Sequence, residues 1–566
     1  MNKNNNTLSK RKPLRFWGWG YADEHLDAEE ESVVDFMART LLPDEGSVFV
    51  QEPEESEYEL PPARITAPEH LAPICSSHRY DRLVHCYGKS FPDLARMFMR
   101  SVPNAPDLVA FPRNEEQLGE LLRYAEDSNV AVIPYGGGTS VCGGVEAAVG
   151  EGYAGTICVD MQGFNQVLDI DEVSRSARIQ AGMLGPDIDA ALKPYGLTLR
   201  HFPQSYQFST LGGWIATRAG GHFATLYTHI DDLVESVRIV TPRGAMETRR
   251  LPGSGAGPSP DRMLIGSEGI YGLITEAAVR LQNRPRWKGT ASVLFNTFEE
   301  ASEGVRAVSQ SGLYPTNCRL LDSDEALLNR VSEAGKAILV LGFESADHPV
   351  NPAMERALAI VRGHGGSIKE EDIEYQDHKS GTRSASSEEA ATWKHAFIRI
   401  PYYKNRFIQH GLIADTFETA ITWERLPEFY AELKQSMAAA IEEISGHKGF
   451  VSCRFTHVYP DGPCVYITFI AVGSTTGNME EVLDTWCQIK AVANKSVVER
   501  GGTITHHHAV GRDHRSGYEQ QVPELYLATL ESAKATVDPK GIMNPGVLID
   551  PKDRNVGVTG ALKDYV

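Results

Sequence analysis

Long apolar runs, paired cysteines and an excess of basic residues are all missing from this sequence. No run approaches the roughly 20 apolar residues that span a bilayer, and the longest, at 337–343 and 464–472, are typical of buried strands. The 75 aspartates and glutamates outnumber the 55 lysines and arginines, and the net charge of −20 argues against a general nucleic-acid binder. The eight cysteines form no CxxC pair, so the sequence indicates neither a disulfide framework nor a zinc ribbon.

Neither end of the sequence reads as an address signal. The first twelve residues, MNKNNNTLSKRK, are polar, contain no apolar core and are expected to be disordered. The last four residues, KDYV, differ from a peroxisomal signal of the SKL type. Together with the unpaired cysteines, these features predict a cytoplasmic protein in a reducing environment.

The chain is too long for one compact core, and its pattern predicts an α+β protein of several parts. Residues 1–102 are interpreted as an N-terminal arm with helices. In this arm the aromatic stretch LRFWGWGYAD at 14–23 should pack on the body, whereas the acidic stretch at 52–59 should be exposed.

The pattern of predicted strands, helices and loops divides the rest of the chain into residues 103–285, 286–500 and 501–566. In the first unit the sequence predicts helices at 115–127 and 186–196, strands at 130–133, 156–159, 177–181 and 273–281, and a hairpin at 237–248. The second unit predicts helices at 298–310 and 426–444 and strands at 336–343 and 464–472. The last segment is a loop rich in glycine and histidine, followed by a helix at 523–537.

A glycine loop, Tyr135-Gly136-Gly137-Gly138-Thr139-Ser140, directly follows a predicted strand. Consecutive glycines let backbone N–H groups converge on a phosphate, and the hydroxyl groups add donors. The loop is neither the dinucleotide motif G-x-G-x-x-G nor a P-loop, because no Gly-Lys-Ser/Thr follows. By itself it fits a structural turn equally well.

Two further segments follow this loop along the chain, HFPQSYQFSTLGGWIATRAGG at 201–221 and IGSEGIYGLITE at 265–276. In this order and spacing, the three segments resemble the FAD-binding elements of the vanillyl-alcohol oxidase family. The resemblance implies a two-subdomain FAD-binding domain of the PCMH type at 103–285 and an α+β cap domain, built on an antiparallel sheet, at 286–500. It also implies that residues 501–566 return to the FAD domain.

The resemblance assigns the cofactor contacts to all three segments. The glycine loop would hold the pyrophosphate, the second segment would line the flavin and its phosphates, and residues 266–269 would lie near the adenine. Histidine-linked members of the family carry a histidine in the first loop, where this chain has Gly138-Thr139-Ser140, so non-covalent FAD is expected. The assigned residues are Pro134, Tyr135, Gly136, Gly137, Gly138, Thr139, Ser140, Gln204, Ser205, Tyr206, Gln207, Phe208, Ser209, Thr210, Gly212, Gly213, Thr217, Arg218, Ala219, Gly220, Gly266, Ser267, Glu268, Gly269, Ile270, Tyr271 and Gly272.

Within that family the chain most resembles the alkyldihydroxyacetonephosphate synthases, from WGWGYAD near its start through its tail. The motifs that carry the likeness are His201-Phe202-Pro203, Cys318-Arg319-Leu320-Leu321-Asp322, Ser452-Cys453-Arg454 with Cys464-Val465-Tyr466, and Thr505-His506-His507-His508. These enzymes exchange the acyl group of acyl-dihydroxyacetone phosphate for a fatty alcohol in ether lipid synthesis. The resemblance implies a small lipid-phosphate substrate, peripheral membrane contact without a transmembrane segment, and a homodimer.

Three single residues have a structural and a functional interpretation. Tyr466 lies in an apolar strand pattern, where a tyrosine is by default a core residue. The resemblance instead makes it the acid that helps the carboxylate leave, a role that suits a phenol protonated near neutral pH. Arg319 would by default form a local ion pair, but it matches an arginine that the family needs for activity. His201 matches a family position near the flavin.

The histidine triplet His506-His507-His508 has two chemical interpretations. In an extended segment neighbours alternate faces, so only His506 and His508 would share a direction. A metal site would need further ligands, and no second His/Cys/Asp cluster has obvious spacing, so no metal is predicted. Imidazoles titrate near neutral pH, and the resemblance assigns them to the active site, which favours proton transfer or substrate binding.

The chain departs from the family at three places. Lys404, in Pro401-Tyr402-Tyr403-Lys404-Asn405, stands where the family has an arginine. It keeps the charge without the bidentate fork and can still bind phosphate, and Arg406 on the same face of a strand would assist. Thr228-His229 replaces Gly-Asn, and Ala509 replaces a glycine. These differences leave FAD binding intact and weaken the assignment of the ether-lipid substrate.

The main alternative function is an FAD-dependent D-2-hydroxy acid dehydrogenase acting on lactate or glycolate. Those relatives bind a metal through His-x-Gly-Asp-Gly-Asn-Leu-His and a later Glu-His-Gly. Here the first stretch begins at His457 but has Cys464 in place of its second histidine, and His507-His508 stands in place of Glu-His. A flavin-binding protein without catalytic activity is a third alternative, which the retained Tyr466, Arg319 and histidines oppose.

Overall fold

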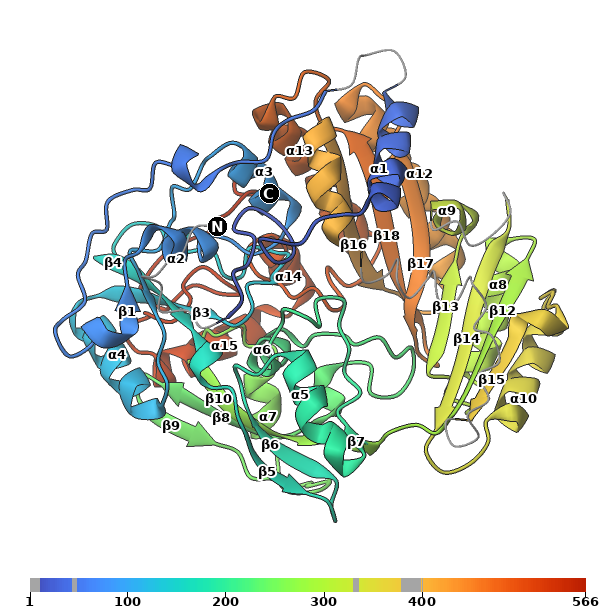
Figure 1. Ribbon diagram of the computed structural model, residues 1–566, viewed down its shortest axis with the longest axis horizontal. Helices are drawn as coiled ribbons and strands as arrows, with labels where there is room; N and C mark the ends of the chain where they lie inside the picture. Colours follow the sequence, from blue (N-terminus) through green and yellow to red (C-terminus); the bar gives the residue numbers. More distant parts are fainter. Residues whose placement is uncertain (1–10, 43–47, 329–334, 378–398, 400, 566) are drawn as a thin grey trace.

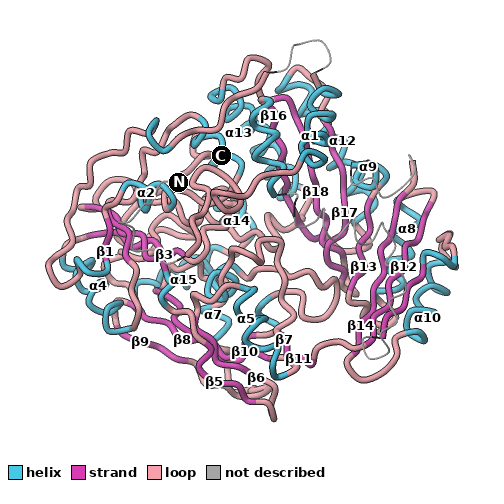
Figure 2. Tube along the Cα trace, in the orientation of Figure 1, coloured by secondary structure: helices cyan, strands magenta, loops and turns pink. Residues whose placement is uncertain are grey.

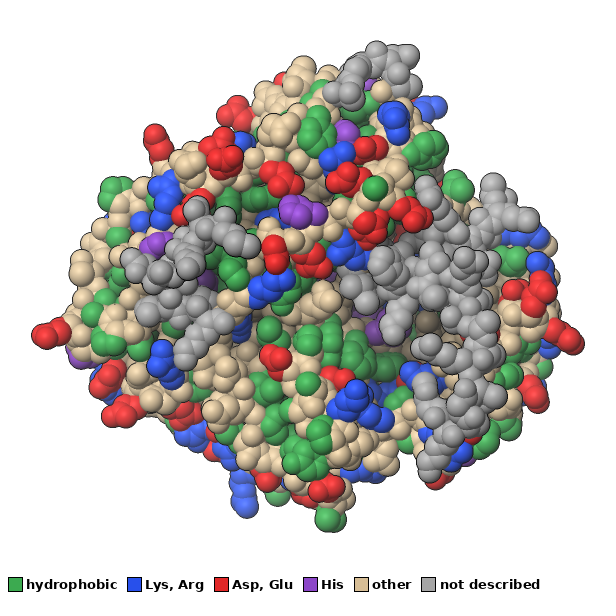
Figure 3. Space-filling view, viewed as in Figure 1, with side chains coloured by type: hydrophobic (Ala, Val, Ile, Leu, Met, Phe, Trp, Pro, Cys, Tyr) green, Lys and Arg blue, Asp and Glu red, His purple; other side chains and the backbone are tan. Residues whose placement is uncertain are grey.

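Three larger β-sheets and the helices that cover them organise the protein (Figure 1). The computed structural model describes residues 11–42, 48–328, 335–377, 399 and 401–565. Two sheets lie at the lower left of Figure 1 and the largest stands at the right. Figure 2 shows that the region between them consists mainly of loops. On the face seen in Figure 3, acidic and basic side chains of the described residues are interspersed.

The first sheet has four strands in the order β1 (Cys75–Ser76), β2 (Leu108–Ala110), β4 (Gly155–Asp160), β3 (Val130–Tyr135). Strands β2 and β3 are parallel to β4, whereas β1 pairs with β2 in the antiparallel direction. Helix α4 (Glu115–Asp127) connects β2 to β3 and buries one apolar face. Since β1 precedes residue 103, the N-terminal part of the chain is joined to this sheet.

The second sheet is antiparallel and completes the region that is predicted to bind FAD. Its order is β5 (Val167–Asp171), β6 (Ser176–Gln180), β10 (Leu273–Arg280), β8 (Val234–Thr241), β9 (Gly244–Glu247). Helices α5 (Gly185–Leu192), α6 (Leu211–Thr217) and α7 (Pro260–Leu264) accompany it, and the short strands β7 (Leu197–Thr198) and β11 (Gln282–Asn283) pair beside it. Its alternating apolar residues pack on α5 and α6 to form one core.

The third sheet has seven antiparallel strands and forms the cap. Its order is β15 (Ile373–Asp377), β12 (Trp287–Phe295), β14 (Ala337–Ser345), β13 (Asn317–Leu321), β17 (Phe450–Val458), β18 (Pro463–Val472), β16 (Leu412–Ala420). The helices of this part are α8 (Phe298–Ser309), α9 (Ser323–Leu328), α10 (Asn351–Arg362), α12 (Leu426–Ser445) and α13 (Met479–Glu499). Strand β16 is an edge strand and lies beside the central loops (Figure 1).

Both ends of the chain are tied to these sheets. Helix α1 (Ala28–Leu41) packs on the ends of β16 and β18, and α2 (Arg79–Val84) and α3 (Phe91–Phe98) lead into β2. After α13 come α14 (Arg515–Gln521) and α15 (Glu524–Val537). The chain then pairs with β3, where the Val132 N–H donates to the Ile542 carbonyl at 2.8 Å. The C-terminal segment therefore returns to the first sheet.

The predicted elements and the observed ones agree closely. The helix predicted at 115–127 is α4, the hairpin at 237–248 is β8 with β9, and the helix at 426–444 is α12. The sequence did not single out β16 or α13, which both border the cavity described below. The predicted disorder at 1–12 lies mostly outside the described residues, but Arg11 donates to the Gly136 carbonyl at 2.5 Å. No helix in the described part of the chain is long and apolar enough to cross a membrane.

Candidate functional site

A cavity lies where the FAD-domain loops meet the edge of the cap sheet. Its floor comes from the glycine loop and the segment at 203–221, and its wall from β13, β16, β17, β18 and α13. The residues predicted to bind FAD that line it are Gly136, Gly137, Gly138, Thr139, Ser140, Gln204, Ser205, Ser209, Thr210, Gly213, Thr217, Ala219 and Gly220. Two of the three predicted cofactor segments therefore lie in one place.

The glycine loop fits against the second segment without room for side chains. A Cβ at Gly137 would lie 1.8 Å from the Phe208 carbonyl oxygen. Gly138 has φ +66°, and a Cβ there would lie 1.9 Å from the Tyr135 hydroxyl. Within the described chain, no group accepts a hydrogen bond from the N–H of Gly137, Gly138 or Thr139. These donors, brought close by missing side chains, fit the pyrophosphate of FAD.

The third predicted segment supports this cradle from behind and does not line the cavity. Ser267 and Glu268 are buried, and the Glu268 carboxylate accepts the N–H groups of Val510 at 2.9 Å and Gly511 at 2.8 Å. Burial raises the pKa of Glu268 to about 7. Because Glu268 holds the loop after the histidine triplet, its role is to join two segments. The predicted contact residues outside the cavity lining are Pro134, Tyr135, Tyr206, Gln207, Phe208, Gly212, Arg218, Gly266, Ser267, Glu268, Gly269, Ile270, Tyr271 and Gly272.

His201 also lies behind the cavity wall. Its ring packs on Trp214, with centroids 5.0 Å apart, and lies against Gly221. Neither ring nitrogen has a hydrogen-bond partner among the described residues. Burial lowers the pKa of His201 to about 3, so the imidazole is neutral. The predicted catalytic role is therefore not supported by its position, because Trp214 and Gly221 separate it from the cavity.

Tyr466 lies on β18 with its ring in the cavity wall. Its hydroxyl donates to the Thr416 hydroxyl at 3.0 Å, and the Arg454 guanidinium lies 4.0 Å from the ring centroid. Burial raises the pKa of Tyr466, although Arg454 opposes this effect. Tyr466 is thus both a buried strand residue and a protonated phenol at the cavity, so the two interpretations of the sequence are compatible.

Two arginines lie beside this tyrosine. Arg319 on β13 lines the cavity, and burial together with the neighbouring Arg454 lowers its pKa to about 9. Arg454 forms a buried ion pair with Glu325 at 2.5 Å. Both guanidinium groups therefore place positive charge at the cavity wall beside Tyr466.

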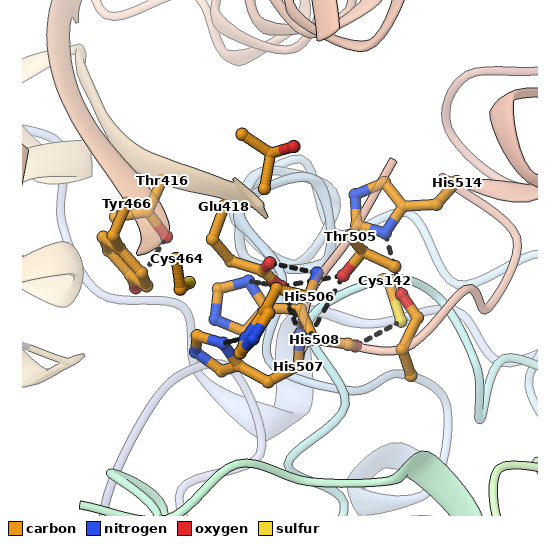
Figure 4. A network of polar contacts seen from close by, with 12 residues as sticks. Cys142, Thr416, Glu418, Cys464, Tyr466, Thr505, His506, His507, His508 and His514 are labelled. Atoms are coloured by element: carbon orange, nitrogen blue, oxygen red, sulfur yellow. Dashed lines mark hydrogen bonds and ion pairs between the residues drawn. The ribbon is translucent and has the colours of Figure 1, made fainter. Parts of the chain in front are cut away.

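A single carboxylate holds the histidine triplet in place. Glu418, on the edge strand β16, accepts the backbone N–H groups of His506, of His507 at 3.0 Å and of His508 at 2.7 Å (Figure 4). Three successive N–H groups can converge on one carboxylate only if the chain curls, so the triplet is a bend and the predicted alternation of an extended segment is wrong. As a result, His507 and His508 are the two that line the cavity.

His506 points away from the cavity. Its Nε2 lies 2.9 Å from the Tyr459 hydroxyl, and its Nδ1 lies 3.0 Å from the Nδ1 of His507. Burial holds the pKa of His506, His507 and His508 well below the usual range, and repulsion from neighbouring histidines and cations adds to this effect. The three imidazoles are therefore neutral near pH 7. His507 and His508 can accept protons at the cavity, whereas His506 orients His507.

The fold brings additional potential metal ligands to the triplet. His457 and Cys464 lie with His506 and His507 so that their ligand atoms are within 4.8 Å of one another. The fold therefore brings together residues whose spacing along the sequence gave no sign of a second ligand cluster. However, His457 already uses Nε2 on the Gly221 carbonyl at 3.0 Å and Nδ1 on the Thr456 hydroxyl at 3.1 Å. The absence of a metal remains a prediction.

The two predicted substrate-binding cations have different positions. Lys404 lines the cavity and forms an ion pair with Asp415 at 2.6 Å. Arg406 pairs with Asp35 at 3.0 Å, outside this cavity. Residues 401–407 are helical, so side chains two positions apart point in nearly opposite directions. The prediction that Arg406 shares a face with Lys404 assumed a strand and is wrong.

Several cavity residues were missed by the sequence analysis: Trp19, Asp415, Arg454, Lys490 and His514. Trp19 belongs to the aromatic stretch at 14–23, which packs on the body as predicted. Lys490 lies on α13 among buried apolar residues such as Trp486 and Ile489. A lysine on the apolar face of a helical pattern was the signal that could have identified it.

Known proteins match both halves of the chain. A family model for the C-terminal domain of FAD linked oxidases matches residues 284–548, and one for an FAD binding domain matches residues 106–249. An alkyldihydroxyacetonephosphate synthase from Trypanosoma brucei brucei is 31% identical over 520 residues, which cover 88% of this chain and 83% of the relative. One from Dictyostelium discoideum is also 31% identical, covering 83% and 77%.

A solved structure of alkyldihydroxyacetonephosphate synthase superposes with a TM-score of 0.76 over 94% of this chain and 98% of the other. The two sequences are 24% identical, so this likeness establishes the fold. The predicted α+β class, with an FAD-binding domain and a cap on an antiparallel sheet, is confirmed.

Proposed function

The chain belongs to the alkyldihydroxyacetonephosphate synthase family of FAD-linked oxidases, and from this premise we propose that it exchanges the acyl group of acyl-dihydroxyacetone phosphate for a fatty alcohol. It is an FAD-dependent enzyme. The observation that carries the proposal is the pairing of Tyr466 and His507, whose rings stack 5.9 Å apart at 22° in the wall of the cavity. A proton donor and a proton acceptor thus lie side by side next to the cofactor cradle.

The exchange needs proton movement without net redox change. The acyl carboxylate leaves with the electron pair of its C–O bond, and the alcohol oxygen forms the new C–O bond and gives up its proton. When bound, FAD would supply electron-accepting chemistry at the substrate carbon. The two protein groups beside it would manage the proton.

Tyr466 is suited to donate and His507 to accept. Burial keeps the phenol protonated, and Arg454 over the ring would stabilise negative charge that develops on its oxygen. His507 is neutral and is oriented by its Nδ1 contact with His506. His508 lies beside His507, with ring centroids 4.7 Å apart, and its ring lies 5.6 Å edge-on from that of Tyr466, so it offers a second acceptor.

A turnover assay tests this proposal. The purified protein is given acyl-dihydroxyacetone phosphate and a long-chain alcohol without an electron acceptor, and the ether product is measured. A parallel assay follows dye reduction by D-lactate and glycolate. Ether formation supports the proposal, whereas dye reduction without ether formation would identify a hydroxy-acid dehydrogenase. Turnover in neither assay would favour a flavin-binding protein without this activity.

The bound state of the cofactor is part of the proposal. The loop residues Gly138, Thr139 and Ser140 provide no histidine for a flavin bond, so acid precipitation should release all of the yellow chromophore. Flavin that remains with the precipitated protein would contradict non-covalent binding.

We also propose the membrane contact, the compartment and the oligomeric state of the enzyme. A long-chain lipid substrate is held in membranes, so the protein should bind peripherally to phospholipid vesicles, which flotation tests. All eight cysteines are free thiols, which fits a reducing cytoplasm. A homodimer is expected from the family resemblance, and light scattering measures the mass directly.

A further inference from the structure

Lys490 is a buried cation that faces the cavity. It lies on α13 (Met479–Glu499) with 4% of its surface exposed, and it lines the cavity. Among the described residues it forms no hydrogen bond and no ion pair, and its Nζ lies 5.7 Å from the centre of the Phe417 ring. Burying an ammonium group without a hydrogen-bonding partner costs free energy, so its retention needs an explanation.

The nearby carboxylate is already occupied. Asp415 accepts a hydrogen bond from Lys404 at 2.6 Å through Oδ1 and one from Trp486 at 2.8 Å through Oδ2. Trp486 lies one helical turn before Lys490 on α13, so the same helix that supplies this donor also supplies the unpaired lysine. Asp415 therefore fixes Lys404 at the cavity wall by a direct hydrogen bond, whereas its attraction for Lys490, like that of Asp513 and Glu418, acts without a hydrogen bond.

The cavity as a whole carries excess positive charge. Its lining includes four cationic side chains, Arg319, Lys404, Arg454 and Lys490. Among the residues that the structure describes, Asp415 is the one carboxylate in the same lining, and Glu325, outside the lining, pairs with Arg454. In a cavity of low polarity this excess favours a ligand with more than one negative charge, such as a phosphate monoester.

We propose that Lys490 binds the phosphate of the substrate together with Lys404, as a second cation that recognises phosphorylated substrates. This inference rests on the proposed function, because that function supplies a phosphate monoester. A phosphate dianion has three terminal oxygens and can accept hydrogen bonds from both ammonium groups at once. Binding would give Lys490 the hydrogen-bonding partner that it lacks among the described residues.

The same chemistry could come from FAD, which also carries phosphates. The predicted cofactor residues that line the cavity contain backbone amides, hydroxyls and amides of side chains, but no cation. Lys404 and Lys490 instead come from residues 401–407 and α13, on the cap side of the cavity. The substrate phosphate is therefore the favoured source, and the experiment separates the two.

The test uses the FAD-loaded protein and three variants. Lys490→Met removes the charge at similar length, Lys490→Arg keeps the charge, and Lys495→Met is the matched control, since Lys495 lies on the same helix with its side chain exposed. Inorganic phosphate is titrated into each protein and followed through the flavin absorbance spectrum. FAD content, melting temperature and KM for acyl-dihydroxyacetone phosphate and its dephosphorylated analogue are measured alongside.

Lys490→Met should weaken inorganic phosphate binding and raise KM for the phosphorylated substrate roughly ten- to hundredfold. KM for the analogue, FAD content and both properties of Lys495→Met should be unchanged, and Lys490→Arg should retain most of the phosphate affinity. Loss of FAD with unchanged phosphate affinity would assign Lys490 to the cofactor and overturn the inference. Unchanged binding of both phosphate and FAD would also overturn it.

Failure of the proposed function would be distinguishable from failure of this inference. Phosphate titration needs no turnover, so a protein that forms no ether could still bind phosphate through Lys490. Conversely, ether formation with a KM that is indifferent to Lys490→Met would leave the function standing and refute the role of Lys490. Equal weakening on the phosphorylated substrate and its analogue, with a lower melting temperature, would show a structural role instead.

Discussion

The guanidinium of Arg454 lies 4.0 Å from the centre of the Tyr466 ring, on a strand adjacent to the tyrosine. Arg454 is held there by its ion pair with Glu325 at 2.5 Å. The contact places a fixed positive charge against a phenol whose proton the reaction would use. A deprotonated Tyr466 would be stabilised by this charge, so the arginine eases proton donation without needing to contact the substrate.

Tyr466→Phe should therefore keep the flavin and lose most of the turnover. The substitution deletes one hydroxyl, which in the resting structure donates only to Thr416 at 3.0 Å. Removing a general acid typically costs 10²–10⁴-fold in rate. Steady-state ether formation and the flavin spectrum are the measurements. Tyr58→Phe is a matched control, because this buried tyrosine donates to the Met97 carbonyl and neither residue lines the cavity. A near-normal rate for Tyr466→Phe would leave this tyrosine with a packing role alone.

The KM of the enzyme should respond differently to removing the charge of Lys404 and to changing the shape of its cationic group. Lys404→Ala removes a phosphate ligand and leaves Asp415 without its partner, so KM should rise roughly ten- to hundredfold and the melting temperature should fall. Lys404→Arg should keep or raise activity, because the guanidinium can contact both the carboxylate and a phosphate. Arg406→Ala is the control. It breaks the pair with Asp35 outside the cavity and should leave KM unchanged. A KM unaffected by Lys404→Ala would remove Lys404 from substrate binding.

Chelators should leave activity intact, even though potential ligands cluster at His506 and His507. The Cys464 thiol accepts a hydrogen bond from Thr456, and burial raises its pKa well above the usual value. A metal would need the thiolate and would have to displace the hydrogen bonds of His457. Dialysis against EDTA followed by assay and elemental analysis is the test. Stoichiometric zinc or manganese whose removal abolishes activity would support the hydroxy-acid dehydrogenase.

His201 should make stability depend on pH in a defined direction. Burial lowers its pKa from 6.5 to about 3, so the unfolded chain binds a proton in this window and the folded protein does not. Its contribution to stability is therefore present above pH 6.5 and is lost as pH falls below this value, by up to about 1.4 kcal/mol per pH unit. Because Glu268 and Asp513 have pKa values raised to about 7 and act in the opposite direction, the measurement must be a difference.

The comparison is between wild type and His201→Phe in urea denaturation at pH 8, 7, 6 and 5. Phenylalanine can keep the ring contact with Trp214 and does not titrate. The stability of wild type relative to the variant should fall between pH 6.5 and 5. A constant difference across this range would mean that His201 is not buried in neutral form.

The sequence predicted those parts of the site that depend on local pattern. The glycine loop needs residues without side chains where it meets Phe208, and that need is visible as three consecutive glycines. Strands such as β18 are visible as apolar runs, which placed Tyr466 correctly. The histidine triplet was also visible, but its conformation was not, because Glu418 lies 88 residues away from His506 along the chain.

The parts of the site that the sequence did not predict depend on contacts between segments that lie far apart along the chain. Asp415 and Lys490 lie on elements that the pattern did not single out, and each gains its role only when α13 packs beside β16. The prediction that Arg406 shares a face with Lys404 was wrong for a local reason, since a helix at 401–407 was interpreted as a strand. A one-dimensional pattern can show which residues are buried, but it does not show which carboxylate a buried cation will meet.

Ala509 is the last departure from the family pattern with a measurable consequence. It follows the histidine triplet, is buried and has φ +72°, a left-handed conformation that costs an L-residue about 1–2 kcal/mol. Its carbonyl lies 2.8 Å from Nδ1 of His514, so the surrounding structure holds it in place. A glycine adopts the same φ freely. Because it is more flexible in the unfolded chain, however, ordering a glycine on folding costs roughly 0.5–1 kcal/mol more than ordering an alanine.

Ala509→Gly should therefore stabilise the protein by about 0.5–1 kcal/mol while leaving the flavin spectrum and turnover nearly unchanged. The matched control is Ala528→Gly in α15, an exposed alanine with ordinary helical geometry, which should lose about 1 kcal/mol. Opposite signs for the two alanine-to-glycine changes, measured by urea denaturation, would identify the left-handed conformation as the cause. If Ala509→Gly destabilises the protein as Ala528→Gly does, then Ala509 is not strained. The backbone strain that accompanies the binding of three histidine N–H groups by Glu418 would then end at His508.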